Sequence, residues 1–124
     1  MKLQIIRLSV VFSFVMLLIA CATPISHTTS QMKTYDKDTE YVIDERADGF
    51  ALTIAYSRYQ FIPESDSLTT ACKSVLTSLA WEIAEKKGKK IRIINEQRIR
   101  ISLGRNGLTG VTSCQANAIV EWAE

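Results

Sequence analysis

Three cysteines, Cys21, Cys72 and Cys114, are the side chains of this chain with the widest range of possible chemistry. A cysteine can take an acyl chain, pair in a disulfide, bind a metal as a thiolate or act as a nucleophile. Metal sites and cysteine or serine nucleophiles usually need a histidine nearby. The one histidine, His27, lies in a polar stretch near the start of the chain, and no Gly-rich phosphate loop precedes a helix. We therefore expect no metal, no cofactor and no enzyme activity.

The residues before Cys21 have the organisation of a secretion signal. Lys2 and Arg7 precede an almost wholly apolar run from Leu8 to Ala20, which ends in a small residue. This is the order of a charged region, an apolar region and a cleavage site. The run has about a dozen apolar residues, whereas a transmembrane helix needs about 20. We therefore assign residues 1–20 to a signal peptide and exclude them from fold prediction.

The residues Leu18-Ile19-Ala20-Cys21 resemble a lipobox, the processing motif of bacterial lipoproteins. The resemblance implies that the Cys21 sulfur carries a diacylglyceryl group, and two or more acyl chains hold a protein stably on a membrane. Ala22 stands where lipoproteins retained in the inner membrane tend to have Asp. The resemblance therefore favours the outer membrane, with the domain in the periplasm or at the cell surface. The alternative is a cysteine that merely follows a signal peptide or an N-terminal helix.

A polar stretch follows the lipobox. From Ala22 to about Thr39 the chain is rich in Thr, Ser, Gln, Lys and Asp and has no periodic apolar face. We expect residues 21–39 to form a flexible tether that reaches about 25 Å on average, with His27 in solvent. The predicted domain then comprises residues 40–124.

The charge of the mature chain is close to zero. Removal of Lys2 and Arg7 takes Lys and Arg from 15 to 13, against 13 Asp and Glu. A nucleic-acid-binding domain normally has a basic excess, so we expect no nucleic-acid partner.

The segment from Tyr41 to Phe61 has the pattern of a β-hairpin. Asp48-Gly49 is a strong signal for a two-residue turn. Centring the turn there pairs Glu45 with Leu52 and places one set of apolar side chains on a single face. That set is Tyr41, Ile43, Leu52, Ile54 and Tyr56, and the opposite face receives Asp44, Arg46, Thr53 and Ala55.

An amphipathic helix is predicted next. Apolar residues recur at three- and four-residue steps, which is typical of one helix face. They are Leu68, Ala71, Cys72, Val75, Leu76, Leu79, Ala80 and Ile83. Ser65 or Asp66 is expected to cap the start, and Gly88 to end the helix.

Asn106-Gly107 signals a second hairpin. A turn centred there pairs Leu103 with Gly110 and Ile91 with Trp122. Asn95 and Gln97 then fall on the apolar face, which requires either a bulge or two amides near the core. We favour the bulge, because a buried unsatisfied amide costs about 1–3 kcal/mol. The order strand, strand, helix, strand, strand predicts a two-layer α+β sandwich (ββαββ), an antiparallel sheet with one helix on one face.

The two cysteines left in the domain are expected to form a disulfide. If Cys21 is lipidated, Cys72 and Cys114 remain as a pair in an oxidising compartment. Both point into the layer between helix and sheet. A disulfide across about 40 residues would contribute roughly 3–4 kcal/mol. The alternative is two reduced, buried thiols.

Arginines are the candidate binding residues. Arg92, Arg98 and Arg100 are predicted on one strand face away from the helix, with Arg105 at the hairpin tip. They could bind acidic lipid headgroups, lipopolysaccharide phosphates or a carboxylate-rich protein surface. The alternative is a solvated face whose charge prevents edge aggregation.

The lipobox, tether and small domain together resemble uncharacterised proteobacterial lipoproteins. Cys114-Gln115-Ala116 on the last predicted strand is faintly similar to the envelope stress sensors of the RcsF type, whose periplasmic domains hold more cysteines. The resemblance implies a non-enzymatic outer-membrane lipoprotein that binds another envelope component or plays a structural part. A stress or signalling sensor that acts through a partner protein and an exclusion-type lipoprotein that masks a surface receptor are the alternatives. The sequence predicts neither the partner's identity nor the oligomeric state.

Overall fold

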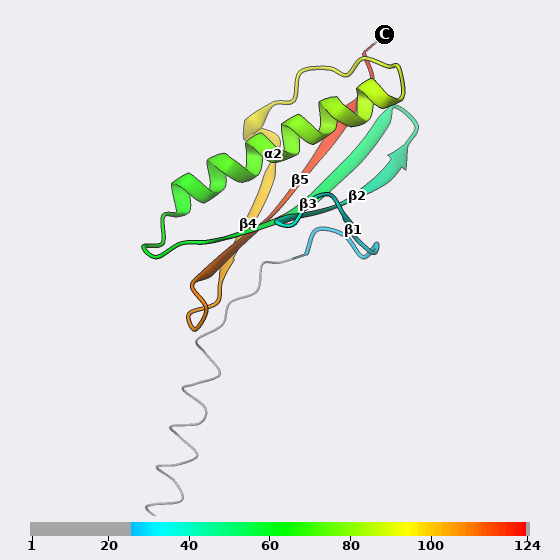
Figure 1. Ribbon diagram of the computed structural model, residues 1–124. Coiled ribbons are helices and arrows are strands. Elements are labelled where there is room, and N and C mark those ends of the chain that lie inside the picture. Colours follow the sequence, from blue (N-terminus) through cyan, green and yellow to red (C-terminus); the bar gives the residue numbers. More distant parts are fainter. Residues whose placement is uncertain (1–25, 124) are drawn as a thin grey trace, which may run out of the picture.

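A five-stranded antiparallel sheet with one long helix across one face forms the domain (Figure 1). The structure is a computed structural model and describes residues 26–123. Its elements are β1 (Lys33–Thr34), β2 (Thr39–Arg46), β3 (Gly49–Tyr59), α2 (Ser65–Lys86), the short 3₁₀ helix η2 (Glu96–Arg98), β4 (Arg100–Arg105) and β5 (Val111–Glu121). The predicted two-layer α+β fold is confirmed, with β1 as an additional edge strand.

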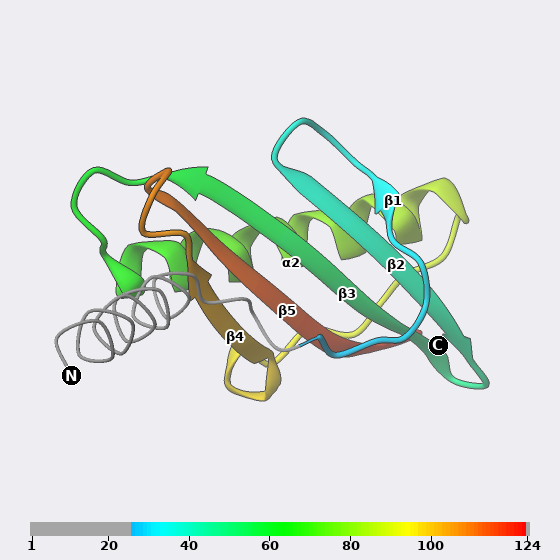
Figure 2. The ribbon, with the colours of Figure 1, turned by 90° about the horizontal axis from the view of Figure 1, so that it is seen from below.

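The strand order is β1-β2-β3-β5-β4, so the two hairpins join through β3 and β5 (Figure 2). This central pair is long, and its register runs from Gly49 opposite Glu121 to Tyr59 opposite Val111. The helix connects the hairpins and lies behind the sheet in Figure 2. The face of the sheet away from the helix is called the outer face below.

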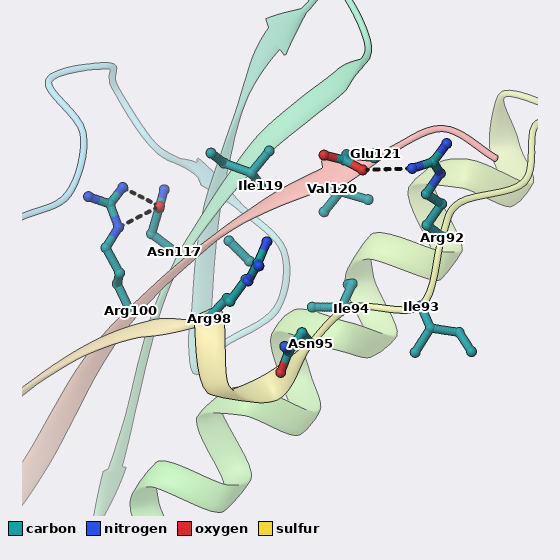
Figure 3. Close-up of a pocket in the computed structure, with 11 residues that line it drawn as sticks. Arg92, Ile93, Ile94, Asn95, Arg98, Arg100, Asn117, Ile119, Val120 and Glu121 are labelled. Atoms are coloured by element: carbon teal, nitrogen blue, oxygen red, sulfur yellow. Dashed lines mark hydrogen bonds and ion pairs between the residues drawn. The ribbon is translucent and has the colours of Figure 1, made fainter.

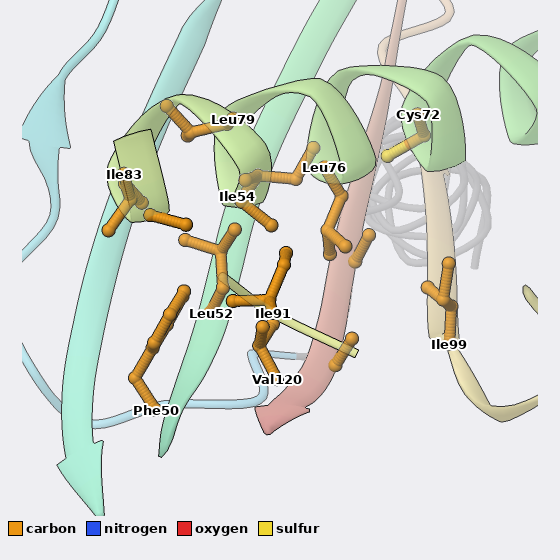
Figure 4. Close-up of a cluster of buried hydrophobic side chains, with 14 of the residues drawn as sticks. Phe50, Leu52, Ile54, Cys72, Leu76, Leu79, Ile83, Ile91, Ile99 and Val120 are labelled. Atoms are coloured by element: carbon orange, nitrogen blue, oxygen red, sulfur yellow. The ribbon is translucent and has the colours of Figure 1, made fainter. Parts of the chain in front are cut away.

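The helix and the inner sheet face form the core (Figure 4). The buried helix residues are Leu68, Cys72, Leu76, Leu79, Ala80, Ile83 and Ala84, nearly the stripe that the sequence predicts. The helix starts one residue earlier than expected, because Glu64 is the N-cap and makes no side-chain capping bond. Gly88 follows the last turn with φ 64°, as a glycine that ends a helix should.

The first hairpin turns one residue earlier than predicted. Glu45 lies opposite Phe50 rather than Leu52, so the turn residues are Ala47-Asp48. Gly49 is the first residue of β3, and its φ is not positive. A Cβ at Gly49 would collide with the carbonyl group of Val120. The glycine is therefore needed for the close approach of β5, not for the turn.

We expect Gly49→Ala to lower the free energy of unfolding by about 1–3 kcal/mol, the range for overpacking a tight site. The added methyl group would push the backbone of β5 away from β3. Gly88→Asn is the matched control, because Asn tolerates a positive φ and no atom lies within 4 Å of a Cβ there. Urea denaturation measures both variants, and equal stability of the parent and Gly49→Ala would refute this role.

The second hairpin has a longer loop than predicted. Leu103 lies opposite Cys114, not Gly110. The Asn106 side chain accepts hydrogen bonds from the backbone N–H groups of Leu108 and Thr109 at 2.9 and 3.2 Å. An Asx turn of this kind is an alternative to the two-residue turn, and it widens the loop.

Residues 92–99 leave the sheet instead of continuing β4. The Asn95 side chain accepts from the backbone N–H of Gln97 at 3.0 Å and so starts η2. Both amides are exposed, so the predicted choice between a strand bulge and buried amides was wrong. Ile91, directly before this segment, bridges to Trp122, directly after β5, as predicted. The hydrogen bond from the Gln97 N–H to the Asn95 side chain satisfies a local backbone group. It costs less free energy than the burial of two amide side chains without partners would.

The structure differs from the expected flexible tether over its second part. Residues 26–32, here called the strap, lie on the outer face of the sheet, and β1 then pairs with β2 (Figure 2). Hydrogen bonds hold the strap there, because its Thr28 and Ser30 hydroxyls donate to the carboxylate of Asp44 on β2. The remaining tether residues, 21–25, lie outside the described residues, as do the predicted signal peptide and Cys21.

Candidate functional site

A groove of about 480 Å³ lies beside the part of β5 that β4 does not pair with (Figure 3). Pairing of β4 with β5 ends at Arg100 opposite Asn117, and residues 92–99 loop outward beside the uncovered stretch of β5. The lining residues are Arg92, Ile93, Ile94, Asn95, Arg98, Arg100, Asn117, Ala118, Ile119, Val120 and Glu121. We call this site the arginine groove.

Three of the four candidate arginines line this groove, although only Arg100 belongs to a strand. Arg92 lies in the connection to η2 and Arg98 ends η2. Arg105 lies elsewhere, because its guanidinium donates to the backbone carbonyl of Gln60 at 3.2 Å. The departure of the chain from the sheet, which the sequence pattern did not predict, is what gathers the three side chains around a cavity.

The three arginines of the groove differ in how they are paired. Arg92 forms an exposed ion pair with Glu121 at 3.4 Å. Arg100 donates to the Asn117 side-chain carbonyl from Nε at 3.2 Å and also from a terminal nitrogen (Figure 3). No hydrogen bond or ion pair within residues 26–123 involves the Arg98 guanidinium, which is exposed. Arg98 is therefore the cation most available to a ligand.

A buried polar row holds Arg100 in place. Asn117 is 3 % exposed and donates from Nδ2 to the Thr53 hydroxyl at 2.8 Å. Thr53 is fully buried, although the sequence pattern predicted it on a face open to water. With its amide nitrogen bound to Thr53, Asn117 presents its oxygen to the guanidinium. The Asn117 role was missed because it depends on the observed strand register.

The strap covers this polar row. The His27 backbone N–H donates to the Gln115 side chain on β5 at 3.2 Å, and the Ser30 hydroxyl donates to Asp44 on β2 at 2.9 Å. The strap thus crosses β3 between these two anchors, which explains why Thr53 is buried. His27 is half-buried rather than in solvent.

The His27 ring is in an environment that disfavours its charged form. Its Nε2 is buried and has no hydrogen-bond partner among the described residues. Burial, and secondarily the positive charge of Arg100, lower the pKa of His27 from its ordinary value of 6.5. The folded chain therefore binds this proton less readily than the unfolded chain.

We expect the strap to detach from the sheet as the pH falls. A lowered pKa means that the strap's stabilisation is present above about pH 6.5 and is lost at lower pH, as the unfolded state gains the proton first. The protection factors of the amides of residues 26–32, which are their exchange rates corrected for the intrinsic rate at each pH, should therefore fall below about pH 6. His27→Gln, which cannot titrate, is the control. Exchange that responds to pH equally in both proteins would contradict this role of His27.

Cys72 and Cys114 lie at disulfide distance between helix and sheet. Their Cα atoms are 6.6 Å apart, and both side chains are buried. This pairing links the first half of α2 to the centre of β5, behind the polar row. The arginine groove is thus built on the strand that carries this cysteine pair.

Among residues 26–123, no three His, Cys, Asp or Glu side chains gather in a way that could hold a metal ion. No helix in this part of the chain is long and apolar enough to cross a bilayer.

Comparisons with known proteins identify no relative. No known family model matches the chain, and no curated protein or solved structure is significantly similar to it.

Proposed function

We propose that this chain is a lipid-anchored envelope lipoprotein, held in the outer membrane through Cys21, whose folded domain is a non-enzymatic binding module. The N-terminal apolar run and the lipobox Leu18-Ile19-Ala20-Cys21 support the anchor. The arginine groove supports binding. Its ligand is an acidic group on another envelope component.

One observation carries the binding part of the proposal: an unpaired arginine lines the same groove as exposed apolar side chains. Arg98 has no partner within residues 26–123, and Ile93, toward the other end of the loop that lines the groove, is 91 % exposed (Figure 3). Ile119 on β5 is also exposed. A guanidinium binds a carboxylate or phosphate through two parallel hydrogen bonds, and the isoleucines would cover the apolar atoms next to that group.

The charge of the lining favours an anion. The groove has three arginines and one acidic residue, Glu121, which is already paired with Arg92. Arg100 is fixed by Asn117, so its orientation costs little entropy when a ligand binds. A partner with an exposed carboxylate or phosphate would therefore meet a preformed cationic site.

Site-specific crosslinking in the envelope tests this function. A photoreactive residue at Ile93 should crosslink one envelope component, and Arg98→Gln should reduce that product about 10- to 100-fold, because a hydrogen bond to a charged group contributes about 1.5–3 kcal/mol. Arg46→Gln, the same charge change at an exposed site outside the groove, is the control. Equal crosslinking by parent and Arg98→Gln would contradict the proposal. Mass spectrometry of the product would separate an assembly subunit, a signalling protein and a surface receptor.

A further inference from the structure

A second unusual surface lies at the opposite end of β5 from the uncovered stretch. Four large apolar side chains are strongly exposed there: Tyr59 at 64 %, Phe61 at 83 %, Ile62 at 70 % and Leu108 at 80 %. They come from the end of β3, from the β3–α2 connection and from the β4–β5 loop, and the connection and the loop lie side by side in Figure 2. We call this cluster the apolar tip. Contiguous exposed apolar side chains of this kind mark contact surfaces.

Backbone bonds hold the two loops of the tip together. The Gln60 N–H donates to the Gly110 carbonyl at 2.9 Å, and its own carbonyl accepts from Arg105 at 3.2 Å. The Thr112 hydroxyl donates to the Gln60 side chain at 2.8 Å. The Tyr59 ring lies so close to Gly110 that a Cβ there would touch it. The tip is therefore braced at its base, while its apolar side chains project outward.

The path of the strap indicates what covers the tip. From His27, beside Gln115, the chain runs toward Asp44 near the far end of β2. Followed backward, it leads toward the end of the sheet that carries the tip. Four residues separate Cys21 from Ser26, and the five Cα-to-Cα steps between them span at most about 18 Å. A lipid on Cys21 would hold this end of the domain close to the bilayer.

The chemistry of the tip fits the interface of a bilayer. Aromatic and aliphatic side chains together are typical of the layer where headgroups meet acyl chains. The segments that form the tip and its base, residues 58–66 and 105–111, contain two arginines, Arg58 and Arg105, and two acidic residues, Glu64 and Asp66. The local charge is therefore balanced, and apolar burial rather than attraction to anionic lipid would drive the contact.

We propose that the apolar tip inserts into the interfacial layer of the membrane that carries the lipid anchor. This inference rests on the proposed anchoring through Cys21. Insertion of the tip would set the orientation of the domain relative to the membrane. β5 runs from Val111 at the tip to Glu121 in the groove, which is about 33 Å at about 3.3 Å per residue. The lipid and the tip form two contacts with the bilayer, and the end of the arginine groove at Glu121 lies away from it.

Quenching of a single tryptophan by lipids brominated in their acyl chains tests the insertion. The full processed chain is reconstituted in phosphatidylcholine vesicles with Trp81→Phe and Trp122→Phe, and one tryptophan is placed by Phe61→Trp. Ile93→Trp in the groove is the matched control, since Ile93 is even more exposed. Ile62→Trp is a second tip variant in case the first does not fold.

The expected result is at least a twofold loss of fluorescence for the tip variants and no loss for Ile93→Trp. If the protein floats with the vesicles but its tip tryptophans are not quenched, the insertion is overturned while the anchor stands. If the protein does not float, both the anchor and the inference built on it fail. A chain that dimerises through the tip on vesicles, with unquenched tryptophans, would also overturn the insertion.

Discussion

The Cys72→Ala/Cys114→Ala variant is expected to unfold with a free energy about 4 kcal/mol lower than the oxidised parent. The two cysteines are 42 residues apart, and loop-closure entropy predicts about 4 kcal/mol for a crosslink of that span. Domains of this size have net stabilities of about 5–15 kcal/mol, so the variant would lose a large share. Urea denaturation of both proteins measures the difference.

Reduction provides the control for this experiment. The parent treated with dithiothreitol should approach the stability of the double variant, because both lack the crosslink and the alanines remove little volume. Free thiols at both positions in unfolded, unreduced protein would contradict the pairing. So would a parent whose stability does not change on reduction.

The Cys21→Ser variant is expected to lose its membrane attachment entirely. A serine hydroxyl cannot take the thioether-linked diacylglyceryl group, and without two or more acyl chains the binding to a membrane is marginal. Labelled palmitate should enter the parent and not the variant. The variant should also keep residues 1–20, which a higher mass would show.

A matched variant separates the anchor from a general effect of losing a thiol. Cys72→Ser changes the same functional group within the folded domain and should take up palmitate like the parent. If Cys21→Ser is processed, labelled and fractionated as the parent is, the anchor does not exist. The binding part of the proposal would then concern a protein that is not lipid-anchored.

The sequence predicted the faces of the strands better than their partners. The observed partner of Glu45 is Phe50 instead of Leu52, and that of Leu103 is Cys114 instead of Gly110. These shifts are two and four residues, whole periods of a strand, so the apolar residues that lie in these strands keep their face. Burial of one sheet face therefore determines which side chains of a strand point toward the core. The turn determines which residues pair across the two strands.

The turn signals failed for physical reasons that the local sequence does not contain. Gly49 serves the approach of β5 to β3, and β5 is distant in the sequence. Asn106 uses its side chain to close a wider loop. In both cases a residue suited to a tight turn has another role that is visible only when the neighbouring strand is in place.

The candidate site was predictable in its residue types but not in its construction. Arg92, Arg98 and Arg100 were expected on one strand face, and they gather instead because the chain leaves the sheet at η2. The buried pair Asn117 and Thr53 that supports the site was missed, because a polar strap was not expected to cover the outer face. Polar cover of a sheet has no periodic signal in sequence.

The mass of the N-terminal peptide of protein extracted from membranes decides whether Cys21 carries lipid. We expect a mature chain that begins at Cys21 and carries the added mass of a diacylglyceryl group, with or without a further acyl chain on its amino group. A chain that retains residues 1–20, or one that carries an unmodified thiol at Cys21, would contradict it.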